Sequence, residues 1–213
     1  MPSNLKNRVD PWGRLRTHGQ RTGTRMGNRG ILHNAEQEVV RHSASDAWLC
    51  CRLSFKGIKR QIFQVTPKFS YSELFFLDEA TALAAGHRPC NDCQPYRFKK
   101  FKAAWCRAHS QELKPSQLLV ASIDEKLEQE RIDSSEKKPA FRASLSELPV
   151  GTIFAVNSTA YLTTSAGHFL WSQDGYTQAD PFKHSTVEVL TPKSVVAVLL
   201  AGYVPQLHAS ADA

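Results

Sequence analysis

The sequence predicts an α+β fold, in which a small domain of strands and helices with a β-hairpin precedes a β-rich module. Apolar and polar side chains alternate in WLCCRLSF, residues 48–55, as they do along a half-buried strand. Helix-forming sequence with capping and stop signals follows between residues 78 and 132. Beyond residue 140 the pattern changes to short apolar runs that are separated by turn residues.

Residues 1–30 are predicted to form a basic N-terminal arm that is rich in glycine and arginine. This segment lacks hydrophobic periodicity, and it carries seven Lys or Arg residues against one acidic residue. Residues 31–213 carry twenty basic and nineteen acidic residues, so most of the net charge of +7 belongs to the arm. This asymmetry favours a polyanionic partner, most simply nucleic acid, over the alternative of a solubilising tail.

The zone from residue 31 to residue 132 is expected to be one domain, and it begins with strands. Residues 48–55 and 61–65 are predicted to pair as a β-hairpin around a turn at 56–60. Alternation along the first of these strands puts Cys51 on the apolar face and Cys50 on the other. Residues 71–77 are predicted to form a third strand.

Three helices are predicted to complete this domain. The first begins at Asp78, whose side chain can cap it, and ends at Gly86. A second helix is expected after Pro95, with an apolar side and many basic residues. The third covers residues 116–132, and the polar segment 133–139 after it is predicted to be a linker.

Residues 140–213 are predicted to form the small β-rich module. Strands are expected at residues 152–156, 160–164, 168–171 and 187–190, because short apolar runs alternate there with turn-forming residues. The apolar run 194–200 fits a further strand or a short helix that begins after Pro192.

The motif that carries chemistry is AAGHRPCNDCQP, residues 84–95, in which Cys90 and Cys93 form a Cys-x-x-Cys pair. A redox pair follows a strand in a thioredoxin-like unit, whereas this pair follows a predicted helix that ends in glycine. Simple packing is disfavoured because the two cysteines lie in a polar turn. Two thiolates on a tight turn can both reach one tetrahedral Zn²⁺, so the pair predicts a zinc site.

A structural zinc ion needs four ligands, and the Cys-x-x-Cys pair supplies two of them. Cys106 lies thirteen residues after Cys93, about 20 Å along a continuous helix, so it is expected to pack rather than to bind. Cys51 lies on the apolar face of its predicted strand, which favours a place in the core. Cys50, Cys51 and a water molecule remain the alternatives for the fourth ligand.

The stretch FFLDEATALAAGHRPCNDCQP, residues 75–95, resembles the metal-binding domain of the Ada DNA-repair protein and related small zinc modules. The likeness lies in an aromatic pair, a Glu-Ala helix and the run Ala-Gly-x-Arg-Pro-Cys-x-x-Cys-x-Pro. The resemblance implies a zinc ion with Cys90 and Cys93 among its ligands, and a DNA partner.

The segment Gly30-Ile31-Leu32-His33 resembles the part of that domain that supplies the third zinc ligand. The resemblance therefore implies His33 as the third ligand, where the family has a cysteine. Gln37 stands where the fourth ligand would be, and it is not a zinc ligand. Because a zinc-bound thiolate accepts the methyl group in the Ada domain, the departure at His33 removes the basis for carrying methyl transfer over to this chain.

Basic residues around these motifs are expected to contact phosphates, namely Arg21, Arg25, Arg29, Arg88, Arg97, Lys99 and Lys100. The sequence thus predicts a nucleic-acid-binding protein that is stabilised by a structural zinc ion, with DNA as the favoured partner. The alternative is a metal-dependent nuclease or another nucleic-acid-modifying or repair enzyme, with His33, Glu36 and Glu38 beside the metal. Whether the chain is an enzyme stays open, and no catalytic residue is assigned.

The chain is expected to be cytoplasmic and to have no membrane partner. No segment approaches the ~20 apolar residues that are needed to span a bilayer, and the basic N-terminus lacks the apolar stretch of a signal peptide. Five cysteines, an odd number, argue against a disulfide framework. Protein partners and the oligomeric state are not indicated.

Overall fold

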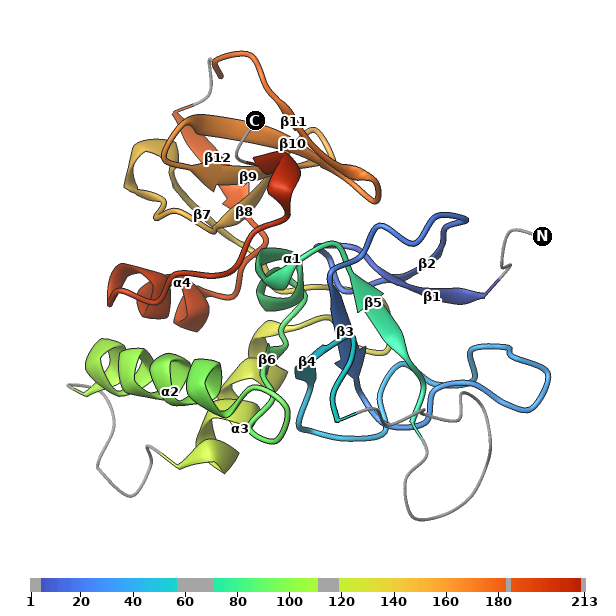
Figure 1. Cartoon of the computed structure of the whole chain (residues 1–213). Helices are drawn as coiled ribbons and strands as arrows, with labels where there is room; N and C mark the ends of the chain where they lie inside the picture. Colours follow the sequence, from blue (N-terminus) through green and yellow to red (C-terminus); the bar gives the residue numbers. More distant parts are fainter. Residues whose placement is uncertain (1–4, 57–70, 111–118, 183–184, 212–213) are drawn as a thin grey trace.

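The computed structural model describes residues 5–56, 71–110, 119–182 and 185–211. Within these ranges the chain forms two six-stranded β-sheets and four α-helices (Figure 1). This confirms the α+β class and the β-rich character of the C-terminal part. No helix in the described part of the chain is long and apolar enough to cross a membrane.

The first sheet has the strand order β2-β1-β5-β3-β4-β6. Its strands are β1 (Lys6–Val9), β2 (Leu15–Thr17), β3 (Arg25–Asn28), β4 (Leu49–Arg52), β5 (Leu74–Phe76) and β6 (Arg88–Pro89). Strand β3 pairs antiparallel with both β5 and β4, whereas β4 and β6 run parallel. The parallel pair brings the chain that follows β6 alongside the end of β4.

The segment expected to be a basic arm is instead part of this sheet. Residues 5–30 contribute the strands β1, β2 and β3, and Val9 and Met26 on these strands are buried. Strands of three or four residues are too short for a period of two to stand out among glycine and arginine, so the sequence pattern gave no strand signal.

Strand β4 forms where alternation predicted a strand, but its described partners are β3 and β6. The expected returning strand of the hairpin, residues 61–65, lies outside the described residues. The third predicted strand is confirmed as β5.

The helices are α1 (Glu79–Ala84), α2 (Pro95–His109), α3 (Val120–Glu130) and α4 (Lys193–Leu200). The predicted signals of α1 are confirmed: Asp78 Oδ1 accepts a hydrogen bond of 2.8 Å from the Thr81 N–H. Gly86 has φ +84°, a left-handed conformation that suits the residue after a helix. Helix α2 begins at Pro95, whose missing N–H would have had no partner in the first turn.

The second sheet has the order β11-β10-β9-β8-β12-β7, and all its neighbouring strands are antiparallel. Its elements are β7 (Phe141–Ser144), β8 (Ile153–Val156), β9 (Thr159–Thr164), β10 (Gly167–Ser172), β11 (Gly175–Gln178) and β12 (Thr186–Val189), with short 3-10 helices at Leu145–Glu147 and Ala209–Ala211. The sequence predicted four of these strands and missed β7 and β11.

The C-terminal part shares its core with the N-terminal part instead of standing as a separate module. Helix α1 lies between the two sheets (Figure 1), and Ala80 packs with Ile153 and Phe169 of the second sheet. Helix α4 packs against α2 and α3 through one apolar cluster that includes Trp105 and Val198. The two parts therefore stabilise each other.

A buried polar junction fastens the C-terminal segment to α1. The carboxylate of Glu79, which is fully buried, accepts hydrogen bonds from Arg97 Nε at 3.0 Å, from the Gln206 N–H at 2.8 Å and from the Tyr203 hydroxyl. Asp78 Oδ2 accepts a further bond of 3.0 Å from the Tyr176 hydroxyl. This junction fixes Arg97 at the N-terminal end of α2, next to the site described below.

Candidate metal centre and the adjoining cavity

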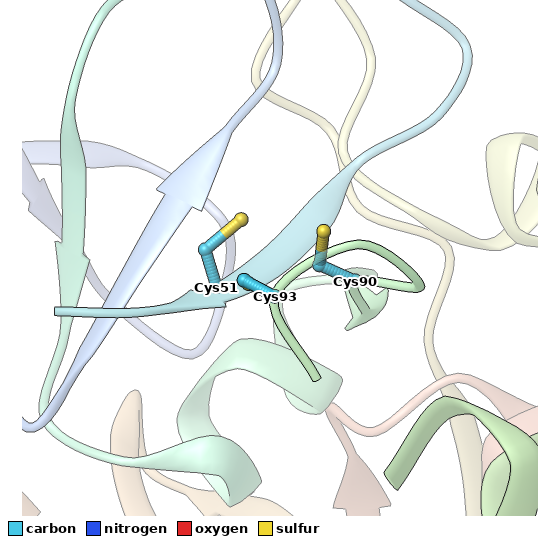
Figure 2. A group of neighbouring side chains, drawn as sticks. All are labelled: Cys51, Cys90 and Cys93. Carbon is cyan, nitrogen blue, oxygen red and sulfur yellow. The ribbon is translucent and has the colours of Figure 1, made fainter. Parts of the chain in front are cut away.

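Three cysteines from two separate parts of the chain meet beside the first sheet (Figure 2). Cys51 lies on β4, Cys90 follows β6 directly, and Cys93 lies just before α2. Their sulfur atoms all lie within 4.8 Å of one another, and all three side chains are buried. Such a group can hold a metal ion.

Backbone pairing explains why the Cys-x-x-Cys turn reaches β4. The Cys90 N–H donates to the Cys50 carbonyl oxygen at 2.9 Å, which continues the parallel pairing of β4 with β6. The Gln94 side-chain amide donates to the same oxygen at 2.8 Å. Because neighbouring side chains on a strand point to opposite faces, the turn meets Cys51, whereas Cys50 packs with Leu74 on the other side.

Hydrogen bonds within this group favour a thiolate at Cys90. Bonds from the Cys51 and Cys93 thiols, followed by bonds from the backbone N–H groups of Cys93 and Asp92, hold the pKa of Cys90 well below its usual range. The bonds to Cys90 and Cys93, together with burial, raise the pKa of Cys51. The Arg52 N–H donates to Cys93 Sγ at 3.4 Å. A metal cation replaces the shared protons in such an arrangement, because it binds thiolates.

The donor set fits zinc. Zn²⁺ prefers thiolate and imidazole ligands, and backbone N–H groups directed at the sulfur atoms stabilise the negative charge that thiolates bring. Cys51, Cys90 and Cys93 would hold the ion and link the end of β4 to the turn that precedes α2. The zinc ion itself stays a proposal.

The third member of the group corrects the sequence analysis. His33 was expected to join Cys90 and Cys93, but its Nδ1 lies 2.8 Å from Ser72 Oγ and its Nε2 lies 3.1 Å from the Lys6 carbonyl oxygen. The structure does not bring His33 into the metal-binding group of the described residues. Cys51, which was expected to pack in the core, takes that place. Two adjacent cysteines on one strand were the signal for it, since one of them must face the turn.

A cavity of about 640 Å³ adjoins the cysteines at Cys93. Arg25, Arg52 and Arg97 line it, and none of the described residues in its lining is acidic. Arg97 is paired with the carboxylate of Glu79, whereas Arg25 donates to neutral oxygens, the Thr24 carbonyl at 2.8 Å and the Gln206 side chain at 2.6 Å. Positive charge in the cavity therefore exceeds what the surrounding carboxylates neutralise.

Arg52 is the most available of the three arginines. It is exposed, and its guanidinium has no hydrogen bond or ion pair with any residue in the described part of the chain. Tyr96 also lines the cavity and is 68% exposed, with the Lys100 ammonium 4.6 Å from the centre of its ring. A cation without a partner among the described residues and an accessible aromatic ring thus line the same cavity.

Five of the seven basic residues from the sequence analysis are exposed or line a cavity. Arg25 and Arg97 line the cavity, and Lys99 and Lys100 are exposed on α2. Arg21 lines a second cavity, of about 390 Å³, which shares its lining residue Leu53 with the first.

The other two residues, Arg29 and Arg88, are buried and have structural contacts instead. Arg88 forms a two-pronged ion pair with Asp124, with both N···O distances 2.7 Å. Arg29 stacks on the ring of Trp48, 3.7 Å from its centre, and donates to the Gly13 carbonyl oxygen at 3.0 Å. Neither guanidinium is available to a phosphate, so the expectation that they bind nucleic acid is corrected.

Comparisons with protein-family models, curated proteins and solved structures give no match for this chain. The likeness of residues 75–95 to the Ada metal-binding domain therefore rests on the sequence motif itself. What the chain does has to be argued from the cysteines and the cavity beside them.

Proposed function

We propose that this is a zinc protein that binds nucleic acid, with DNA as the favoured partner. One observation carries the proposal: three buried thiols that can hold a metal ion adjoin a cavity whose described lining residues include three arginines and no acidic residue. Zinc would link β4 to the start of α2 and so hold both walls of the cavity in place. Phosphates of the nucleic acid would enter the cavity.

The charge distribution supports a phosphate ligand. Arg52 lines the cavity and has no partner for its guanidinium among the described residues, and guanidinium groups match phosphate oxygens with paired N–H donors. Arg21, Lys99 and Lys100 extend the positive surface beyond the cavity, as an extended phosphate backbone requires. Tyr96 adds a ring on which a base can stack.

The metal half of the proposal is tested by metal analysis of the purified protein. We expect about one zinc ion per chain, which is lost in Cys51→Ala and in Cys90→Ala. Cys106→Ala is the matched control, because Cys106 is a half-buried cysteine on α2 outside the group. His33→Ala should also keep its zinc. Wild-type protein that folds and remains metal-free in the presence of excess zinc would contradict this half.

The binding half is tested with labelled single-stranded and double-stranded DNA and RNA at two salt concentrations. The double variant Arg25→Ala, Arg52→Ala should bind more weakly than the wild type, and its affinity should depend less on salt. With fewer phosphate contacts, fewer counterions are released when the complex forms. Arg142→Ala is the control, because Arg142 is an exposed arginine on β7 in the second sheet. Equal affinity for the double variant and the control would count against the cavity as the binding site.

A further inference from the structure

We infer that the metal centre of Cys51, Cys90 and Cys93 keeps one coordination position for an exogenous oxygen ligand, either water or a phosphate oxygen from the arginine-lined cavity. This inference rests on the proposed zinc site and goes beyond a structural role for the ion. A closed structural zinc site uses four protein ligands, whereas a site with three protein ligands leaves a position for water or substrate. Whether the proposed centre is open or closed therefore depends on how many ligand atoms the protein places around the ion.

Among the described residues, the metal-binding group stops at three donors. Cys50, the neighbour of Cys51, points to the opposite face of β4 and is fully buried with Leu74 and Phe76. Both ring nitrogens of His33 are already within hydrogen-bond distance of other oxygens. Neither Cys50 nor His33 therefore supplies a fourth donor.

The chain next to the centre offers no further ligand. Residues 57–70, which follow β4, contain no Cys, His, Asp or Glu. Glu79 is buried, and its carboxylate is taken by Arg97, Tyr203 and the Gln206 N–H. Asp92 lies between the two cysteines of the turn, but its side chain is exposed and outside the group. The described part of the chain thus supplies no fourth ligand for a four-coordinate ion, and we assign that position to an exogenous oxygen.

Charge explains why an anionic oxygen can fill this position. One Zn²⁺ ion and three thiolates sum to a charge of −1, so an anionic ligand would be repelled by the centre alone. The cavity that touches the centre at Cys93 supplies opposite charge: Arg25 and Arg52 have no carboxylate partner within the described part of the chain. Their guanidinium groups would hold a phosphate whose oxygen reaches the metal.

Cobalt provides the test, because Co²⁺ replaces Zn²⁺ in thiolate sites and its visible absorption changes with each ligand. The wild-type protein is loaded with one equivalent of Co²⁺ and titrated separately with imidazole, a neutral probe, and with inorganic phosphate. We expect both probes to shift the visible bands. Arg52→Ala should weaken the response to phosphate about tenfold, since it removes one charged hydrogen bond, and leave the response to imidazole unchanged. Cys50→Ala should respond like the wild type.

The outcomes separate this inference from the proposed function. Visible bands that respond to neither probe show a closed centre and overturn the inference, while the zinc site stands. A response to imidazole alone, or equal phosphate responses in wild type and Arg52→Ala, overturns the assignment of the ligand to the cavity. Failure to bind Co²⁺ or Zn²⁺ overturns the metal site itself, and with it this inference.

Discussion

The two ends of β4 hold arginines in opposite environments. At its start, the guanidinium carbons of Arg29 and Arg131 lie 3.7 Å and 4.3 Å from the centre of the Trp48 ring, and both arginines are buried. At its end, Arg52 is exposed and faces the cavity beside Cys93. The same residue type therefore stabilises the fold at one end of the strand, and at the other it is exposed without a partner in the described part of the chain.

The physical difference lies in what satisfies each charge. At the buried end, carbonyl oxygens accept from the guanidinium groups: that of Gly13 from Arg29 at 3.0 Å and that of Asp46 from Arg131 at 2.9 Å. Burial, and then the charge of Arg131, lower the pKa of Arg29. At the open end, no such partner of the Arg52 guanidinium is found in the described ranges. A count of positive charge thus overstates a binding surface unless each cation is checked for an internal partner.

The largest effect is expected at the buried end, from Arg88→Ala. Arg88 lies opposite Leu49 in the pairing of β6 with β4, and its removal leaves the Asp124 carboxylate buried without a partner. We expect the free energy of unfolding to fall by about 3–5 kcal/mol. The control Arg52→Ala should change it by less than about 0.5 kcal/mol. Urea denaturation measures both variants.

A second variant tests the cause of that loss. Replacing both partners, Arg88→Met with Asp124→Leu, should recover most of the stability, because no unpaired charge is left. An equal loss of unfolding free energy in Arg88→Ala and Arg52→Ala would contradict this prediction. It would mean that burial does not distinguish the arginines at the two ends of β4.

Tyr96→Ala is expected to show the opposite pattern, a binding effect with little change in stability. The ring is exposed at the cavity, so its loss should weaken binding of single-stranded nucleic acid by about 1–3 kcal/mol for one stacked base. Tyr96→Phe should bind like the wild type, because the ring is kept. Leu200→Ala is a control, since Leu200 is 66% exposed on α4. Fluorescence anisotropy with labelled oligonucleotides would refute the stacking role if Tyr96→Ala matched this control.

The sequence could predict the elements whose signals are local. The cap at Asp78, the stop at Gly86 and the proline at the start of α2 each act within one turn of helix, so α1 and α2 were found. The strands β1 and β3 were missed because they pair with distant segments, β1 with β5 and β3 with β5 and β4. Strand β2 pairs locally with β1, but its three residues are too few to show a strand period. The shared core was also not predicted, because it joins α4 to α2 across some ninety residues of chain.

The ligands of the candidate metal centre likewise separate into those that local sequence predicts and one that it does not. Cys90 and Cys93 are joined by a local turn, so their spacing was enough to identify them. Cys51 comes from a strand about forty residues earlier, and only the parallel pairing of β4 with β6 brings it to the turn. The burial of Arg29 and Arg88 depends on Trp48 and Asp124, which are likewise distant in sequence. Local spacing therefore predicts part of a site, and topology completes it.

Lys138 offers a pH test of the buried end. Its ammonium donates to the Ala84 carbonyl oxygen, and burial, followed by the charge of Arg29, lowers its pKa from 10.5 to about 7. Between pH 7 and pH 10.5, Lys138 is protonated in the unfolded chain and neutral in the folded chain, so the free energy of unfolding rises with pH. The penalty is complete below pH 7 and vanishes above the unfolded pKa. Lys138→Met should remove this rise, which is about 2 kcal/mol between pH 7 and pH 9.

The check is the difference in unfolding free energy between Lys138→Met and the wild type, measured at several pH values. We expect the variant to be more stable at pH 7 and its advantage to shrink toward pH 10. Lys126→Met serves as the control, because Lys126 is exposed on α3 and pairs with Glu130 across one helical turn. A difference that does not change with pH would show that Lys138 keeps its proton in the folded state.

The smallest expected effect belongs to a single arginine at the open end. If Arg52 contacts one phosphate, Arg52→Ala should reduce the slope of log K against log salt by about 1 and weaken binding to different sequences equally. Arg142→Ala, on the exposed edge strand β7, should leave the slope unchanged. Titrations of one labelled oligonucleotide at three or more salt concentrations give both slopes. Parallel slopes for the wild type and Arg52→Ala would place the phosphates elsewhere, and the free charge at the end of β4 would then serve only to neutralise the thiolates beside it.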